Sequence, residues 1–369
     1  MEIVPLTKNK YQEWDDFCLE SPDAWFWHST SWLEYSLNYR PEFNSTSLSF
    51  MVTENKEILA ICPLILEIRN GIKEFAFGGE MTWTPAPAFA DLSPKKREKV
   101  INFTFEHIDK LALENKIDWT YLVIPPLTFP RYNYLMKQGY IDISLNTQVV
   151  DLTQDLKAIH SAMRKGHDYD TDRGLRYLEI TIFDKDNITR DVFDGYCYLL
   201  HIDPSHTYET RPQVTFDMMY DWILQGNAIL VSALLPMDTT ASFTSTKMRK
   251  YIGFSYITTY KKKAYYGSAC SDPEYHQMPI GHTLTWRTIE WLKENGFKYY
   301  ELGWQQYGNL PYDMPSKKEV EISFFKRGFG GFTVPLFRGE KYYSADYYLK
   351  INTERINKYA NYLMKKEEK

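Results

Sequence analysis

The sequence predicts an α/β protein with mixed sheets, arranged as two related domains in tandem. A length of 369 residues fits two or three domains of ordinary size. Both halves read in the same order of helix, strands, helix and strand, which indicates a repeated architecture joined near residue 150. A long helix at 280–295 ends at Gly296, and a strand follows at 299–303, as is typical of an α/β unit.

The first half begins with a predicted helix at 10–20. Ser29 or Thr30 can cap a second helix that runs to 37. Strands at 49–53 and 58–66 flank a hairpin turn, and Pro63 marks an edge or a bulge. The remaining elements are a strand that ends at 75–79, an extended loop at 84–88, a helix from Ser93 to 115, a buried strand at 119–124, and a short helix at 132–138 before Gly139.

The second half repeats this order. Predicted helices lie at 156–164, 188–200, 215–224 and 280–295, and predicted strands at 178–183, 228–235, 251–259, 264–269 and 299–303. Apolar residues then recur at helical spacing at Tyr347, Tyr348, Ile351, Ile356, Tyr359 and Leu363, so we expect a C-terminal amphipathic helix that packs on the body. The expected domains are 1–150, with 335–369 packing back on it, and 151–334.

Composition excludes several classes of protein. Trp, Tyr and Phe make up 16% of the chain, which argues against disorder and fits an aromatic core or a cleft lined by rings. The net charge of −5 argues against a general nucleic-acid binder, so we expect no DNA partner. The four cysteines are far apart and read as reduced thiols.

The chain shows no segment of the kind that targets or anchors a protein. Residues 1–16 are polar and contain no apolar signal region, and the longest apolar runs are too short to span a bilayer. We therefore expect a cytoplasmic protein without a transmembrane segment, and peripheral membrane association stays open.

Motifs of several enzyme classes are missing. The sequence contains no GxGxxG, P-loop, GxSxG or HExxH motif, and its histidines are scattered. We therefore expect no metal site and no bound cofactor. The most informative stretch is 251–303, where two aromatic strands lead through a polar loop to a helix opened by Gly281. The N-terminus of such a helix suits an anion, because its backbone N–H groups and its dipole point there.

This order of elements, closed by YELG at 300–303, resembles the acyl-donor half of the GNAT acetyltransferase fold. More specifically, the chain resembles the bacterial Fem family of aminoacyltransferases and its FemAB-like relatives, which carry two GNAT-like domains in tandem. The matching segments follow the family order along nearly the whole chain: WHSTSWLEYS at 27–36, AICPLIL at 60–66, the stretch 269–303, and ISFFKRGFGG at 322–331. The resemblance implies a cell-wall or polysaccharide biosynthesis transferase.

Two departures from the pattern bear on the acyl donor. Gln277 and Gly281 stand one residue too far apart for the GNAT pyrophosphate signature, which argues against ordinary coenzyme A binding. The helical hairpin that some Fem enzymes insert for their tRNA is absent, and in the run MRKGHDYDTDR at 163–173, where relatives are usually basic, three aspartates offset the basic residues. Both features argue against a tRNA donor held by a broad basic face. We still assign Gln277, Gly281 and His282 to the donor site.

The resemblance places the catalytic residues in the second domain. Phe325 and Lys326 match the Phe-Lys pair of the family, in which the lysine stabilises negative charge, and acyl transfer does build an oxyanion. The alternative is a surface lysine beside a core phenylalanine. Glu301 matches an acidic family position and, as a carboxylate at a strand end, could be the general base. Water could replace it, and a structural role is the other interpretation.

The remaining candidates would bind substrate. Arg211 precedes a helix and could hold a phosphate or carboxylate with Tyr208, although a structural ion pair is an equal alternative. Tyr256 and Tyr265 lie on adjacent strands, and Tyr265 and Tyr266 face opposite sides of theirs. We assign Tyr256, Tyr265, Phe325 and Trp304 to the acceptor site, with ordinary packing as the alternative.

Together these observations predict an acyltransferase. It would move an acyl or aminoacyl group from acyl-CoA or aminoacyl-tRNA onto an amine of a cell-wall precursor or a surface-polysaccharide amino sugar, with a small-molecule or nucleotide-linked acceptor. One alternative is an acetyl-CoA-dependent N-acetyltransferase of a small molecule or nucleotide-linked sugar. The other is a non-catalytic protein of the same fold that binds a glycan or precursor.

Overall fold

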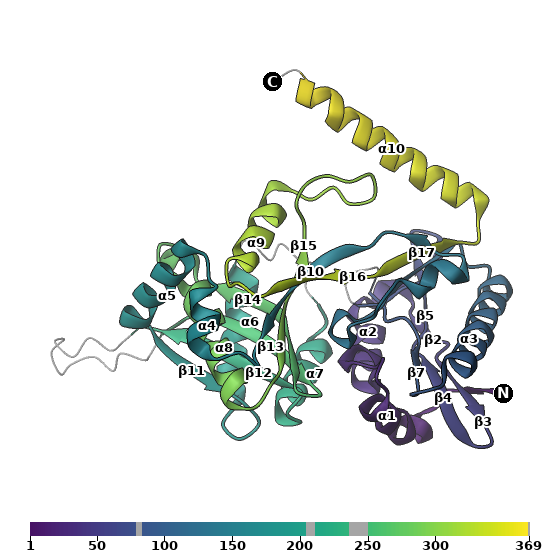
Figure 1. Cartoon of the computed structure of the whole chain (residues 1–369), viewed down its shortest axis with the longest axis horizontal. Coiled ribbons are helices and arrows are strands. Elements are labelled where there is room, and N and C mark those ends of the chain that lie inside the picture. Colours follow the sequence, from purple (N-terminus) through teal and green to yellow (C-terminus); the bar gives the residue numbers. More distant parts are fainter. Residues whose placement is uncertain (79–82, 204–210, 236–249, 368–369) are drawn as a thin grey trace. The chain divides into compact units, whose positions relative to one another are not determined.

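The computed structural model describes residues 1–78, 83–203, 211–235 and 250–367 (Figure 1). Its contacts divide the chain into two compact units. The first consists of 1–147, 304–323 and 334–369, and the second of 148–303 and 324–333. Residues 304–323 therefore group with the first unit, whereas the sequence assignment places them in the second.

The first unit contains two sheets. One has the order β1-β3-β4-β7, and its neighbouring strands are antiparallel. The other has the order β2-β5-β6-β8-β17-β9, in which β6 and β8 run parallel. The strands are β1 (Glu2–Pro5), β2 (Thr46–Ser47), β3 (Phe50–Glu54), β4 (Glu57–Cys62), β5 (Ile65–Arg69), β6 (Ile72–Phe75), β7 (Ala88–Phe89), β8 (Trp119–Val123), β9 (Ile141–Asp142) and β17 (Arg338–Tyr342).

The hairpin predicted near residue 55 is confirmed. β3 and β4 pair antiparallel across a turn in which Asn55 and Lys56 both have positive φ. The strand predicted at 58–66 is instead two strands that belong to different sheets, with Pro63 between them. Proline cannot donate a ladder hydrogen bond, which explains the break at this residue.

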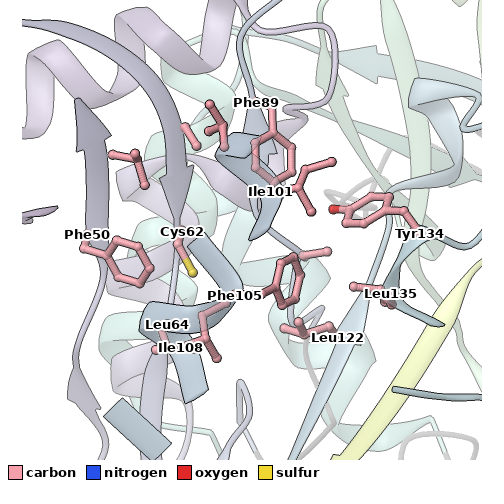
Figure 2. Close-up of a cluster of buried hydrophobic side chains, with 14 of the residues drawn as sticks. Phe50, Cys62, Leu64, Phe89, Ile101, Phe105, Ile108, Leu122, Tyr134 and Leu135 are labelled. Atoms are coloured by element: carbon pink, nitrogen blue, oxygen red, sulfur yellow. The ribbon is translucent and has the colours of Figure 1, made fainter. Parts of the chain in front are cut away.

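The core of the first unit forms between the sheets and α3 (Pro94–Asn115). Figure 2 shows Phe105 and Ile108 of this helix directed at Cys62 of β4, Leu122 of β8 and Leu64 between β4 and β5. The other helices are α1 (Tyr11–Glu20) and α2 (Thr30–Tyr39). The predicted cap of α2 is confirmed, because the side chain of Ser29 accepts a hydrogen bond from Trp32 N at 3.2 Å.

The second unit is built on one large mixed sheet of order β11-β12-β13-β14-β15-β10-β16. Strands β11 to β14 are antiparallel neighbours, whereas β14 and β15 run parallel and are connected through α8 (Ile280–Glu294). This crossover brings the ends of β14 and β15 to the same edge. The strands are β10 (Leu145–Asp151), β11 (Glu179–Phe183), β12 (Ala228–Leu234), β13 (Tyr251–Tyr260), β14 (Lys263–Ser271), β15 (Tyr299–Gln305) and β16 (Phe332–Leu336).

Five more helices accompany this sheet: α4 (Leu156–Ser161), α5 (Lys165–Tyr177), α6 (Arg190–Ile202), α7 (Gln213–Leu224) and α9 (Lys317–Arg327). Neither α5 nor α9 is predicted from the sequence. Helix α5 contains two glycines and several aspartates, which are poor helix formers. It forms because it packs closely on α8, where a Cβ at Gly174 would overlap Thr283 Oγ1. Short 3-10 helices lie at Lys8–Lys10, Phe26–His28, Pro41–Phe43, Pro126–Thr128, Tyr134–Gln138 and Pro273–Tyr275.

The C-terminal helix α10 (Ala345–Glu367) is present, but its packing differs from the prediction. Its first turns contact the first unit, where Arg355 forms a bidentate pair with buried Glu340 and the ring of Tyr347 lies near Trp119. Ile356 and Leu363, expected against the body, are 62% and 45% exposed. The helix predicted from the apolar spacing is confirmed, but this spacing alone does not specify how much of the apolar face packs against the rest of the protein.

Candidate functional site

Lys326 lies at the end of α9, next to the end of β15. A Cβ built on Gly303 would be 2.8 Å from Lys326 Nζ, so the ammonium sits almost directly over the backbone of this glycine. Gly303 also has a φ of +100°, which other residues rarely adopt. The glycine of the YELG segment therefore supplies both an unusual backbone conformation within β15 and the space for the lysine.

The side chain of Lys326 is largely removed from solvent. Burial lowers the pKa of its amine to about 8, and the electrostatic effect of Glu301 opposes this shift. The ring centroid of Tyr266 is 5.3 Å from Nζ, and burial raises the pKa of that phenol to about 12. Among the described residues, no side chain forms a hydrogen bond or ion pair with Nζ. The structure thus presents a partly buried cation that can turn toward a bound anion.

Glu301 precedes Gly303 by two residues on β15 and is fully buried. It pairs in register with Tyr265 of β14, one residue before the tyrosine that lies near the lysine. Because β14 and β15 are parallel neighbours, the fold brings Tyr266 and Lys326 together with the strand end. The predicted pair Glu301 and Lys326 is therefore close in space and electrostatically coupled.

Phe325 contacts the first turn of α8. The nearest atom of its ring would be 3.3 Å from a Cβ on Gly281, and its centroid is 4.9 Å from that of His282. The neighbouring Phe329 ring completes an apolar contact at this helix end. The structure thus brings Phe325, Gly281 and His282 together, and the N-terminus of α8 is covered by side chains rather than open.

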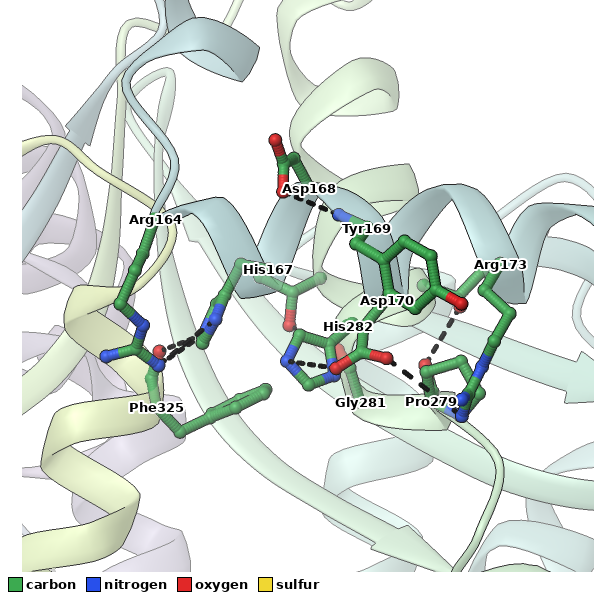
Figure 3. A network of polar contacts seen from close by, with 12 residues as sticks. Arg164, His167, Asp168, Tyr169, Asp170, Arg173, Pro279, Gly281, His282 and Phe325 are labelled. Atoms are coloured by element: carbon green, nitrogen blue, oxygen red, sulfur yellow. Dashed lines mark hydrogen bonds and ion pairs between the residues drawn. The ribbon is translucent and has the colours of Figure 1, made fainter.

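Helix α5 covers the same helix end with a polar network (Figure 3). His167 Nε2 donates to Phe325 O at 2.8 Å, and its Nδ1 accepts from Arg164 at 3.1 Å, so the network assigns a neutral ring. His282 Nε2 lies 4.0 Å from a carboxylate oxygen of Asp170. Burial and the neighbouring His167 lower the pKa of His282 to about 4.

The other predicted donor residue lies apart from this network. The side chain of Gln277 is exposed and bonds to the ring of His276 at 2.7 Å. Its backbone carbonyl accepts from Arg173 of α5 at 2.9 Å. Gln277 therefore helps to hold α5 against the loop before α8, and its side chain does not join Gly281 and His282.

The predicted acceptor residues occupy separate places. Arg211 lies 4.5 Å from the centroid of the Phe216 ring and approaches Met219 Sδ at 3.9 Å. Tyr256 is buried, and its hydroxyl donates to Met219 O at 2.8 Å, a contact that fits packing of α7 on the sheet. Trp304 belongs to the first unit, where its ring is 5.9 Å from that of Trp83. Tyr208 lies outside the described residues.

Sequence reasoning did not assign a role to several residues of this site. Gly303 is the last residue of YELG and of the strand predicted at 299–303, and a glycine in that position was the available signal. Tyr266 was considered only as the neighbour of Tyr265. His167 and Asp170 of α5, and Arg164 at its N-cap, were not assigned, because the helix that presents them was not predicted.

The described residues hold neither a metal-binding cluster nor a membrane-spanning helix. In the ranges that the structure describes, no three or more His, Cys, Asp or Glu side chains lie so as to hold a metal ion. Within the same ranges, no helix is both long enough and apolar enough to cross a membrane.

Comparisons with known proteins agree with this architecture. Residues 208–313 match the sequence profile of the acetyltransferase (GNAT) domain family. The solved structure of FemX superposes with a TM-score of 0.67 at 14% identity, over 95% of this chain and all of that chain. The structure of L-PGS from Bacillus licheniformis superposes with a TM-score of 0.54 at 11% identity, over 91% of this chain and 98% of that one. A search of curated proteins gave no match.

Proposed function

We propose that this chain, a GNAT-type acyltransferase with the fold of FemX, moves an acyl or aminoacyl group onto an amine of a cell-wall precursor or a surface-polysaccharide amino sugar. The observation that carries the proposal is the position of Lys326. Its ammonium lies over the backbone of Gly303 and beside buried Glu301, and it forms no hydrogen bond or ion pair with any described residue.

Lys326 would stabilise the negative charge that develops during transfer. When an amine attacks an activated acyl group, the carbonyl oxygen becomes an oxyanion and the leaving oxygen or sulfur gains charge. A fixed cation in a site with little water stabilises both, and loss of one such group typically costs a rate factor of about 10² to 10³. The geometry requires no metal for this role, since the side chain itself supplies the positive charge.

Glu301 acts on Lys326 in this proposal rather than on the acceptor amine. A carboxylate that is fully buried cannot readily exchange a proton with a substrate, which weakens its assignment as the general base. Its electrostatic effect instead raises the pKa of Lys326 and so keeps more of the amine charged. The proton of the acceptor amine would then pass to water.

The covered end of α8 favours a donor other than acyl-CoA. A pyrophosphate at that helix end would need the space where Phe325 contacts Gly281 and where α5 packs. We therefore favour an aminoacyl ester, as in aminoacyl-tRNA, as the donor. If acetyl-CoA stabilises the protein against heat and supports turnover, the second candidate, an acetyl-CoA-dependent N-acetyltransferase, is the correct one.

The decisive experiment is a product screen by mass spectrometry. Purified protein is incubated with acetyl-CoA or with aminoacyl-tRNA, and with cell-wall precursors or nucleotide-linked amino sugars. The active combination is then repeated with Lys326→Gln and with Lys318→Gln, a matched control that removes an exposed lysine from the same helix. We expect a rate loss of about 10² or more for Lys326→Gln only.

Either of two results would contradict the proposal. Equal rates for Lys326→Gln and Lys318→Gln would show that Lys326 has no role in the reaction. Binding of a glycan or precursor without turnover by any donor would favour the non-catalytic binding protein.

A further inference from the structure

A second cation without a carboxylate partner lies in the first unit, outside the Lys326 site. Arg338 of β17 extends toward two aromatic rings, with its guanidinium carbon 5.1 Å from the centroid of Tyr121 and 5.8 Å from that of Trp304. All three residues belong to the first unit. The two rings orient the guanidinium through cation–π contact, which leaves its edge available for hydrogen bonds.

The hydrogen bonds that Arg338 does form use its backbone. Its N–H donates to Ser144 Oγ at 3.2 Å, and its carbonyl accepts from Asn133 at 3.0 Å. The side-chain Nε is buried and has no hydrogen-bond partner within the part of the chain that the structure describes. A buried donor without a partner is costly, and a bound anion would remove that cost.

An acidic group that interacts electrostatically with Arg338 is already engaged. Asp313 acts electrostatically on Arg338, but its two carboxylate oxygens accept from Gln306 Nε2 at 3.0 and 3.2 Å. No ion pair between Asp313 and Arg338 is formed within the described ranges. The guanidinium is therefore held near a carboxylate without being neutralised by direct contact.

Exposed aromatic rings border this cation. Trp304 of β15 is 41% exposed, although a tryptophan usually buries most of its ring, and Tyr307 and Tyr312 in the segment after β15 are also exposed. A flat, exposed indole surface suits the apolar C–H face of a sugar ring. The exposed indole of Trp304 thus matches the sugar ring, and the guanidinium of Arg338 matches the anionic group, of an acidic sugar.

We infer that Arg338 and Trp304 form a binding subsite for a sugar that carries an acidic group, either a carboxylate or a phosphate. The guanidinium would accept the anion in a bidentate pair, and the indole would stack on the sugar ring. This inference goes beyond the proposed function, because it concerns a binding site that lies within the first unit alone. The binding itself does not require turnover.

The test measures binding without a donor. Glucuronic acid and glucose 1-phosphate serve as acidic probes, with methyl glucuronate and glucose as neutral ones, and affinity is measured by calorimetry and ligand-observed NMR. The acidic probes should bind, the neutral ones should bind at least about tenfold more weakly, and Arg338→Gln should weaken acidic binding by a similar factor. Trp304→Leu should weaken acidic and neutral probes alike.

The controls separate loss of the site from loss of the fold. Arg131→Gln removes an exposed arginine from the same unit and should bind like the wild type. Arg338→Lys keeps the charge but not the planar fork and should give intermediate affinity. Lys326→Gln should bind the probes normally even where it abolishes transfer, so failure of the proposed function and failure of this inference are distinguishable.

Two outcomes would overturn the inference. One is equal binding of acidic and neutral probes. The other is an Arg338→Gln variant that melts at the wild-type temperature and binds the acidic probes as tightly as Arg131→Gln does.

Discussion

Replacing Gly303 by alanine tests whether the approach of Lys326 to the backbone matters. The new Cβ would be 2.8 Å from Lys326 Nζ, closer than real Cβ contacts allow, so the ammonium must move away. The φ of +100° adds backbone strain of about 1–2 kcal/mol, as for other residues forced into left-handed conformations. Stability and lysine position should therefore both change.

Gly296 supplies the matched control. It also has a positive φ, of +73°, but no atom lies within 4 Å of the Cβ that an alanine would add. Gly296→Ala should lose about 1 kcal/mol of unfolding free energy, which lowers the melting temperature by about 2–4 °C, without affecting Lys326. Gly303→Ala should lose at least as much stability and, in addition, change the chemistry of the lysine.

The assay is competitive acetylation with trace acetic anhydride, read by mass spectrometry over a pH series. With a pKa of about 8, roughly half of Lys326 is neutral and reactive at pH 8, whereas a lysine of ordinary pKa near 10.5 is almost entirely protonated. Gly303→Ala should shift the midpoint for Lys326, and Gly296→Ala should not. The transfer rate should fall about tenfold or more for Gly303→Ala alone.

The reasoning would be refuted by one clear result. If both variants fold and their Lys326 midpoints and transfer rates are the same, the contact between Lys326 and Gly303 has no functional consequence.

The remaining predictions concern pH, packing and the buried carboxylate. His282 has a pKa of about 4 in the folded chain and near 6.5 when unfolded, so the unfolded state binds more protons between these values. The free energy of unfolding should therefore fall by at most about 3 kcal/mol as the pH drops from 6.5 to 4. Urea titrations should show a smaller fall for His282→Gln, and an identical pH profile for this variant would contradict the assignment. Gly174→Ala should destabilise the protein by about 1–3 kcal/mol, because the new Cβ would overlap Thr283. Gly166→Ala in the same helix has open space around its Cβ and should stabilise the protein by about 0.5–1 kcal/mol. If calorimetry ranks the two variants in the opposite order, the close packing of α5 on α8 is disproved. Glu301→Gln should lower the acetylation midpoint of Lys326, since the carboxylate holds that pKa up, and an unchanged midpoint would show that the two groups are not coupled.

Much of the fold follows from local sequence patterns. The helices α1, α2, α3 and α8 and the hairpin at Asn55 were predictable because caps, periodicity and turn residues act within a few residues of one another. The pairing of Lys326 with Glu301 was predictable only through the resemblance to the Fem family. Nothing in composition or spacing brings residues 301 and 326 together.

Tertiary structure decided the rest. Helix α5 is rich in glycine and aspartate, and it forms because Gly174 allows it to approach α8 closely. Long-range packing of this kind overrides intrinsic propensity and leaves no local signal. The same is true of Tyr266, which the parallel pairing of β14 with β15 and the position of α9 bring to Lys326. The sequence by itself determined the elements and the chemical groups, and the three-dimensional fold decided which groups meet, because contacts between distant segments depend on packing that no short stretch contains.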